Sequence, residues 1–415
     1  MKSVVELLSG GARRGPVDIV LAATAIALLG FGVVMVYSAS VVEATVVFRD
    51  PQYFLKRQAV YALGGLAIIL LVSRIDYHRL RPLTYPILGV VTVMMILSVI
   101  GFGHTGGGAA RWLALGPIHI QPSEAAKLAL ILWLAYSLAK KQEKVKSFSI
   151  GMVPHFLMAG FLMALCLKQP DFGGASMLLL LTFTLLFVAG ARLGYLLGAA
   201  MLGAIFAIWA VRFTDYRWER MLAWFNMAEH RGDLAYQPFQ SVMSFGSGQF
   251  SGLGLGQGLQ VLYLPEAHTD FISAIVGEEL GLLGILCLCG AYLLIVSRGV
   301  RTALEADDDY GSYIAFGISV LFGAQALINM SVAMAMLPTK GLTLPFVSYG
   351  GSSLLVNATA MGVLLGISRR SESRRNTRTT AGGPLPEASA MLVTEATFAP
   401  EAMRGAKRAP QEARA

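Results

Sequence analysis

Long hydrophobic runs separated by short polar connections dominate the chain. A helix needs roughly 20 mostly apolar residues to cross a bilayer, because lipid offers unpaired backbone groups no hydrogen-bond partner. Ten such runs predict ten spanning helices, at 17–39, 55–73, 83–101, 122–139, 149–167, 172–190, 193–212, 271–297, 311–336 and 346–368. The pattern therefore predicts an all-α integral membrane protein whose membrane domain covers residues 17–368.

The positions of lysine and arginine predict how these spans are oriented, because basic residues concentrate in cytoplasmic connections. If the N-terminal segment 1–16 is cytoplasmic, 22 of the 33 lysines and arginines lie on the cytoplasmic side and 10 lie outside. Both termini are then cytoplasmic. Residues 213–270 become one long extracytoplasmic loop, and loops of this length are usually functional. The tail 369–415, rich in Arg, Ala and Pro, is predicted to be disordered, with its basic start beside anionic lipid.

The composition excludes several classes of protein. With 55% hydrophobic and 14% charged residues and a mean hydropathy of +0.62, the chain could not cover a soluble fold. The net charge of +8 does not indicate nucleic-acid binding, because the basic residues are scattered between apolar runs. No phosphate-binding loop and no histidine pair at zinc spacing is present. The three cysteines lie in apolar runs and are predicted to be small buried hydrophobic residues.

Four charged residues lie well inside predicted spans, where a charge costs a few kcal/mol. They are Glu124, Lys127, Glu278 and Glu279, all in the outer halves of their spans. Glu124 and Lys127 share a helix face, so they form either an ion pair that fixes helix packing or part of a functional site. Glu278 and Glu279 point in directions about 100° apart, and a structural role is the favoured interpretation. Any chemistry is predicted to face outward.

Asp270 ends the long outer loop, directly before the eighth predicted span and close to His268 and Glu266. Spacing alone favours a helix N-cap, a role that Thr269 could also fill. Its place at the outer lipid boundary, at the end of the longest outer loop, weakens the cap interpretation and leaves a chemical role open. The glycine-rich stretch 246–258 follows no predicted strand, so it indicates a close-approach loop or re-entrant turn rather than a dinucleotide site.

Four segments in order resemble the signature segments of a known bacterial family. They are RWLALGPIHIQPSEAAKLAL (111–130), KQPDFGG (168–174), LPEAHTDFISAIVGEELGLLG (264–284) and LPTKGLTLPFVSYGGSS (337–353). They resemble the SEDS family (shape, elongation, division and sporulation), and the resemblance covers about residues 17–368. The stretch MAMLPTKGLTLPF is similar to the division type, FtsW, rather than to the elongation type, RodA.

The resemblance implies a ten-helix fold and glycosyltransferase activity on lipid II at the outer face of the bacterial cytoplasmic membrane. It also implies work at the septum with a class B penicillin-binding protein and other division proteins. The catalytic aspartate of the family matches Asp270. Candidates for contact with the diphosphate and sugars are Arg111, Lys127, Lys340, Glu124, His268 and Ser348. Residues expected to support the site are Asp171, Glu278, Glu279 and Pro265.

The implied reaction needs few groups. Forming a β-1,4 bond from an α-linked lipid diphosphate inverts the anomeric carbon, so a single base, assigned to Asp270, suffices. The leaving diphosphate needs cations. The candidates are Arg111, Lys127 and Lys340, and a divalent ion such as Mg²⁺ or Mn²⁺ could assist them. Two alternatives stay open, a lipid II flippase and a non-catalytic scaffold for division proteins. A flippase would line both halves of the membrane with polar residues.

Overall fold

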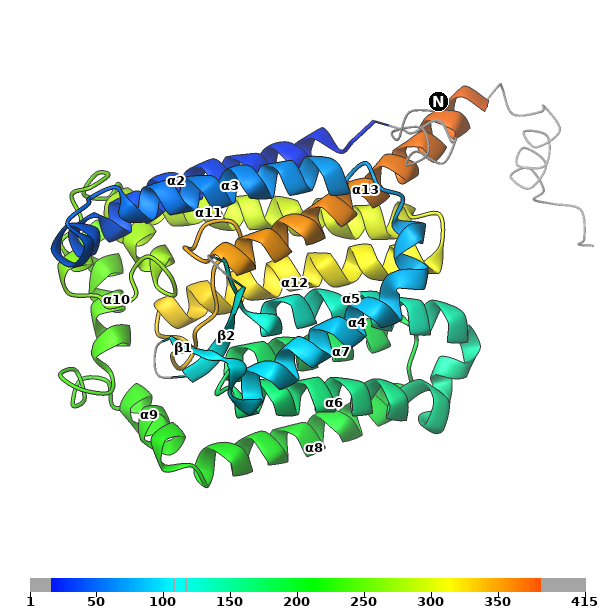
Figure 1. The fold of residues 1–415 in the computed structure, drawn as a ribbon, viewed down its shortest axis with the longest axis horizontal. Helices are drawn as coiled ribbons and strands as arrows, with labels where there is room; N and C mark the ends of the chain where they lie inside the picture. The colour runs from blue at the N-terminus through cyan, green and yellow to red at the C-terminus, as the bar shows by residue number, and fades with distance from the viewer. Residues whose placement is uncertain (1–15, 107–108, 116–117, 382–415) are drawn as a thin grey trace, which may run out of the picture.

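The computed structural model describes residues 16–381, except 107–108 and 116–117. In this part of the chain a long helix occupies the position of each predicted span. These helices lie side by side in one bundle (Figure 1). Their bounds are α2 Ile19–Phe48, α3 Tyr53–Val72, α4 Leu80–Leu97, α5 Pro122–Lys141, α6 Val153–Lys168, α7 Phe172–Val188, α8 Leu193–Arg212, α11 Ile272–Glu305, α12 Asp309–Ala333 and α13 Gly351–Ala381.

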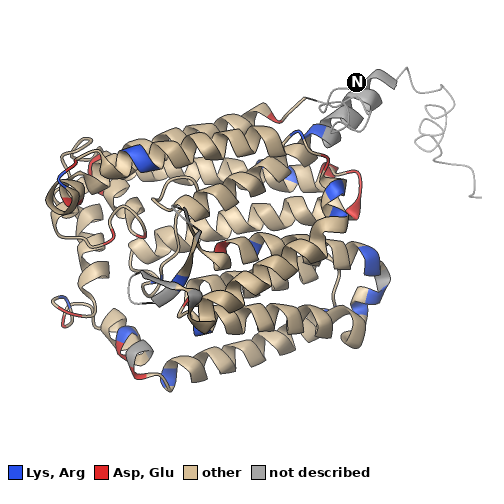
Figure 2. Cartoon of the chain, viewed as in Figure 1, with Lys and Arg blue, Asp and Glu red and all other residues tan. Residues whose placement is uncertain are grey.

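Eight of these described helical segments are long and apolar enough to cross a membrane. The other two are α7, which is apolar but has 17 residues, and α5, which carries Glu124 and Lys127. Charged residues are sparse along the long helices and gather at the two ends of the bundle (Figure 2). The chain is therefore a predominantly helical protein of the membrane type, as the apolar runs predicted.

The prediction of an all-α fold is wrong in one segment. Residues 104–120 hold three short antiparallel strands in the order β1-β2-β3: β1 His104–Gly106, β2 Ala109–Leu115 and β3 Ile118–Ile120. His104 pairs with Trp112 and Gly106 with Ala109, which sets β1 antiparallel to β2. A segment this short has too little apolar surface to span the membrane, and it closes its backbone hydrogen bonds as a small sheet instead.

The long segment 213–270 is not irregular throughout. It contains α9 (Asp215–Phe225) and α10 (Tyr236–Gly248), and a 3₁₀ turn follows at Gln260–Leu262. Further short helical turns lie at Tyr77–Arg79, Ser98–Phe102, Gln142–Lys146 and Phe148–Met152.

The last helix continues past the predicted end of its span. Disorder was predicted from residue 369, but α13 runs to Ala381. Residues 369–381 contain no Gly or Pro, so the helix formed in the span can propagate through them. The segments 1–15 and 382–415 lie outside the described residues.

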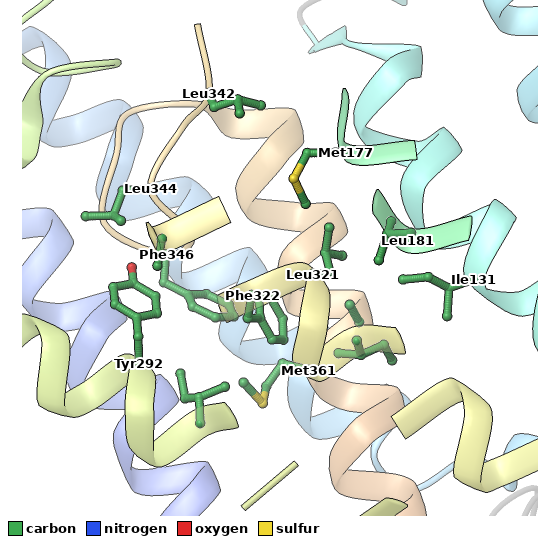
Figure 3. Packing of buried hydrophobic residues seen from close by; sticks show 14 of the residues in the cluster. Ile131, Met177, Leu181, Tyr292, Leu321, Phe322, Leu342, Leu344, Phe346 and Met361 are labelled. Carbon is green, nitrogen blue, oxygen red and sulfur yellow. The ribbon is translucent and has the colours of Figure 1, made fainter. Parts of the chain in front are cut away.

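A buried connection between α12 and α13 forms part of the core. Residues 342 and 344–348 are buried, and Phe346 packs against Phe322 with 5.3 Å between ring centroids (Figure 3). Non-helical backbone is tolerated inside a membrane bundle only where its polar groups find partners. Tyr292 of α11 supplies one, donating its hydroxyl to the carbonyl of Pro345 at 2.6 Å. The connection 334–350 therefore re-enters the bundle; we call it the re-entrant loop.

The cysteine prediction holds for one residue of three. Cys166 is buried, whereas Cys287 and Cys289 are exposed on α11. Lipid is as apolar as a protein interior, so hydrophobic character inside a span does not reveal which face is buried.

Candidate active site

Asp270 lies just before α11 and does not cap it. The N-cap residue of α11 is Phe271, and no side chain donates or accepts a capping hydrogen bond there. The Thr269 hydroxyl is turned away, donating to the carbonyl and carboxylate of Glu266. Among the described residues no hydrogen-bond partner is found for the Asp270 carboxylate. The cap that spacing favoured is thus absent, and this acid is left without a structural role of its own.

The surroundings of Asp270 favour its neutral form. Its side chain is half-buried, and loss of contact with water raises the pKa of its carboxyl to about 7. The negative charge of Glu266 raises that pKa further, the positive charge of Arg111 opposes it, and Asp171 adds to it. A carboxyl that titrates near neutral pH can accept a proton efficiently under physiological conditions.

The re-entrant loop brings a lysine to the same end of the bundle. A Cβ atom at Gly341 would lie 3.1 Å from Oδ2 of Asp270, so the loop backbone passes directly beside this carboxylate. Lys340 precedes it, with its ammonium 5.9 Å from the centre of the Phe172 ring. Burial lowers the pKa of Lys340.

Arg111 and Asp171 meet at the connection between α6 and α7. From β2, the Arg111 guanidinium donates to the carbonyls of Gln169 (2.9 Å) and Pro170 (2.7 Å). Asp171 caps α7, accepting from the amide of Gly174 at 2.7 Å. Two predicted site residues therefore lie together, and in this structure Asp171 serves as the N-cap of α7.

Glu124 and Lys127 form a buried ion pair. Lys127 Nζ lies 2.7 Å from Glu124 Oε1, and the lysine side chain is 1% exposed. The other carboxylate oxygen accepts from the Ser353 hydroxyl, which in turn bonds with Thr343 of the re-entrant loop. The positive charge of Lys127 is thus neutralised by Glu124. The pair anchors the loop that carries Lys340, which favours the structural interpretation of the two that the sequence left open.

Glu278 and Glu279 hold the glycine-rich segment 249–260, which we call the strap, against α11. Glu278 accepts from the amides of Leu259 (2.9 Å) and Gln260 (3.1 Å). Glu279 accepts from the Ser38 hydroxyl of α2 at 2.6 Å. Both acids are buried and hydrogen-bonded, which favours the structural interpretation.

The strap also repairs a break in α11. Gly281 has φ 64° and ψ −160°, which interrupts the helical hydrogen bonds. The amides of Leu253 and Gly254 donate to the freed carbonyls of Glu278 and Glu279. A Cβ atom at Gly281 would collide with the backbone nitrogen of Gly252. The glycine-rich stretch is therefore a close-approach loop, as its sequence suggested.

The remaining predicted residues lie around the segment 264–271. His268 is buried between Phe54 and Tyr349, with Nδ1 3.4 Å from the carboxylate of Glu43. Burial lowers the pKa of His268, and the charge of Glu43 opposes this. Pro265 is exposed. The Ser348 hydroxyl is buried and accepts from the amide of Leu344 at 2.8 Å, so it stabilises the re-entrant loop.

One residue at this site gave no signal in the sequence. Asn329 of α12 is 2% exposed and bonds the backbone of Asp270 and of Leu342. A single polar residue in an apolar run could have raised the question, but its partners are 59 and 13 positions away along the chain.

The donor set for a divalent ion is incomplete. Within residues 16–381 and outside the two gaps, no group of three His, Cys, Asp or Glu side chains is placed to hold a metal. Asp171 is occupied as a cap and Glu266 is bonded by Thr269. These described residues therefore do not fit a divalent ion.

Comparisons with known proteins agree with these features. Residues 19–373 match the FtsW/RodA/SpoVE model, described as cell cycle protein. A probable peptidoglycan glycosyltransferase FtsW from Geobacter metallireducens is 48% identical over 355 residues, covering 85% of this chain and 95% of the relative. Stage V sporulation protein E of Bacillus subtilis is 37% identical over 358 residues, covering 85% and 97%.

Solved structures show the same fold. A chain from a structure on the coordination of polymerization and crosslinking by a peptidoglycan synthase complex superposes with a TM-score of 0.71. It is 28% identical, and the match covers 86% of this chain and 98% of that one. The crystal structure of Thermus thermophilus rod shape determining protein RodA gives a TM-score of 0.64 at 29% identity, covering 86% and 97%. The chain belongs to the FtsW/RodA/SpoVE family of cell cycle proteins, the SEDS family that its four motifs resembled.

Proposed function

We propose that this protein is a peptidoglycan glycosyltransferase that polymerises lipid II into glycan strands during septal wall synthesis. The observation that carries the proposal is Asp270, a half-buried acid with a pKa near 7 that caps no helix. The activity named for its relative from Geobacter metallireducens supports the same reaction. The name FtsW supports a role in division rather than elongation.

The proposal places the site on the extracytoplasmic side of the bacterial cytoplasmic membrane. All ten long helices span the bilayer, including α5 and α7, and both termini are cytoplasmic. The excess of lysine and arginine on that side supports this orientation. The buried ion pair makes α5 acceptable in a bilayer, because its two charges neutralise each other.

In the proposed mechanism Asp270 acts once, as a general base. The 4-hydroxyl of an incoming lipid II gives its proton to the carboxylate while its oxygen attacks the anomeric carbon of the growing strand. The bond to the lipid diphosphate breaks as the new β-1,4 bond forms, so the configuration inverts and no covalent enzyme intermediate is needed. A base that titrates near the working pH is efficient in this step.

The leaving diphosphate gains negative charge, and fixed cations would stabilise it. Lys340 and Arg111 are the proposed partners. Lys340 directly precedes Gly341, whose backbone lies beside Asp270, and Arg111 is close enough to lower the pKa of that acid. Lys127 is paired with Glu124 and takes a supporting role in this scheme.

The proposed partners are lipid II, the nascent strand and a class B penicillin-binding protein that cross-links it. The match to a chain from a structure on a peptidoglycan synthase complex supports such an assembly. Other division proteins at the septum and the surrounding bilayer complete the set, and nucleic acid is not part of it.

The test is polymerisation of purified lipid II by full-length protein, purified together with its penicillin-binding protein. Asp270→Asn should lower the rate about 10²- to 10⁴-fold, the usual contribution of a general base, while insertion and partner binding persist. Asp50→Asn is the control, because Asp50 is an outer acid that pairs with Lys56 on the surface. Normal polymerisation by Asp270→Asn would rule out the proposed role.

A flippase and a scaffold predict different outcomes. A flippase would translocate labelled lipid II across proteoliposomes without polymerising it. The inner-half histidine His155 is buried and bonded to Ser137 and the Gly151 carbonyl, which gives no support to a polar route through the inner half. A scaffold would recruit its division partners equally well with Asp270→Asn, and even the unsubstituted protein would form no glycan strands.

A further inference from the structure

Asn329 joins three segments of the site through one carboxamide. Its Nδ2 donates to the carbonyl of Asp270 at 2.9 Å and to that of Leu342 at 2.7 Å. Its Oδ1 accepts from the Ser273 hydroxyl at 3.0 Å. Both N–H bonds and the carbonyl oxygen are used. Because carbonyl groups can only accept, the nitrogen must face Asp270 and Leu342, and the orientation of the amide is fixed by its partners.

The segments that Asn329 joins carry the two groups that the reaction needs. Asp270 precedes α11, whereas Leu342 follows Lys340 and Gly341 in the re-entrant loop. The Asp270 side chain has no hydrogen bond of its own among the described residues, so its position depends on its backbone. Tyr349 adds one further bond, from its amide to the carbonyl of His268, at the far end of the loop. Next to Asp270, Asn329 is the residue that connects the start of α11 to the re-entrant loop.

A neighbour on the same helix shows that burial alone does not create this arrangement. Gln325 lies one turn away on α12 and is fully buried, yet in the described chain neither of its side-chain polar atoms has a hydrogen-bond partner. The helix therefore presents two buried carboxamides of almost the same chemistry. Only that of Asn329 is tied to the site.

We propose that Asn329 is a positioning residue, whose carboxamide sets the separation between Asp270 and the Lys340–Leu342 segment. The inference rests on the proposed function, because it needs a base at Asp270 and a cation at Lys340. A transfer reaction depends steeply on such geometry, and a displacement of about 1 Å can cost about 10²-fold in rate. A buried, fully bonded amide on a rigid helix suits this task.

The experiment compares variants of the full-length protein, purified with its penicillin-binding protein and supplied with lipid II. Asn329→Leu removes both donors without adding a titratable group, and Asn329→Asp keeps the shape but replaces the amide donors. Each should lower kcat about 10²-fold and change KM less than about threefold. Ser273→Ala leaves both donors in place but removes the hydroxyl that holds the amide oxygen of Asn329, so it should lower kcat measurably but by less than about tenfold. Gln325→Met is the matched control and should leave kcat unchanged.

The pH profile separates positioning from a general loss of stability. When Asn329→Leu frees the Asp270 backbone, its carboxyl gains contact with water, so the acid limb of kcat should move to lower pH by about one unit. A purely structural residue would lower thermal stability while kcat per folded molecule and the acid limb stay as in the unsubstituted protein. That result would overturn the inference.

The remaining outcomes also decide. If both Asn329 variants fail to insert, the acid limb of Ser273→Ala is read instead, and an unshifted limb with full kcat counts against the inference. If Asp270→Asn polymerises normally, the proposed function fails first. If Asp270→Asn is inactive but Asn329→Asp and Asn329→Leu are fully active, the proposed function stands and only the positioning role of Asn329 is lost.

Discussion

Two helices, α7 and α11, begin at the same end of the bundle, and each is preceded by an aspartate. Asp171 accepts from the amide of Gly174 and caps α7. Asp270 accepts no such bond, and α11 begins without a side-chain cap. The same residue type in nearly the same sequence position is thus used as a structural cap in one place and left free in the other.

The difference lies in how each helix start is held. The cap of α7 comes from its own sequence, three positions from its partner. The first turns of α11 are held from outside: the strap binds Glu278 and Glu279 and bridges the break at Gly281, and Asn329 binds the backbone of Asp270. Because distant segments fix this helix start, Asp270 does not have to. Other residues thus take over at α11 the structural role that Asp171 has at α7.

The largest expected effect comes from adding a side chain to α11 where the strap packs against it. Gly281→Ala places a side chain at positive φ and against the backbone of Gly252. We expect a loss of about 3 kcal/mol or more in stability, measured by thermal unfolding in detergent. Gly290→Ala, in open space on the same helix, should change stability by less than about 0.5 kcal/mol. A tolerated Gly281→Ala would mean that the strap does not hold α11.

The pH dependence of polymerisation tests the free acid directly. The pKa of Asp270 is raised to about 7, so the carboxyl is protonated, and inactive as a base, below that pH. The rate should fall about tenfold per pH unit on the acid side and reach about 1% of its plateau at pH 5. Thermal unfolding at each pH separates titration from denaturation. An acid limb near pH 4 would place Asp270 among ordinary carboxylates.

The proposed role of Lys340 concerns the start of α11, where Asp270 lies, and substituting this lysine tests that role. Lys340→Met should lower the rate about 10- to 100-fold, because a cation near the leaving diphosphate is lost while the apolar stem is kept. Lys56→Met, which removes a surface lysine paired with Asp50, is the control and should have little effect. Equal rates for both variants would exclude Lys340 as a contact to the diphosphate.

The smallest effect is expected from the cap itself. Asp171→Ala should cost about 1 kcal/mol of stability, because the Gly174 amide loses its partner. Asp270→Ala should not destabilise the protein in this way. Because the pKa of Asp270 is raised from 3.8 to about 7 in the folded protein, its ionisation costs stability progressively between these two pH values and the loss is complete above pH 7, so this variant should be about as stable as the unsubstituted protein at pH 4 and more stable at pH 8. Thermal unfolding at both values measures this contrast.

Sequence patterns singled out most of the candidate site residues but did not reveal which of them contact one another. Glu124, Lys127, Glu278 and Glu279 were visible because charged residues stand out in apolar runs. Which of them serve structure was not visible, since Lys127 could equally have been free. The ion pair with Glu124 and the bond from Ser353 decided that question, and Ser353 lies 229 positions from Glu124.

The sequence alone determined the long apolar helices, and it indicated a close-approach loop as one of two interpretations of the glycine-rich stretch. These features depend on local requirements: a bilayer demands some 20 apolar residues in a helix, and glycine alone permits tight backbone contact. Only the tertiary structure decided which face of α11 holds Cys287, that residues 104–120 form strands, that Asp270 caps nothing and that Asn329 binds it. Those outcomes depend on partners brought together by packing, and a hydrogen bond across 59 residues leaves no periodic trace along the chain.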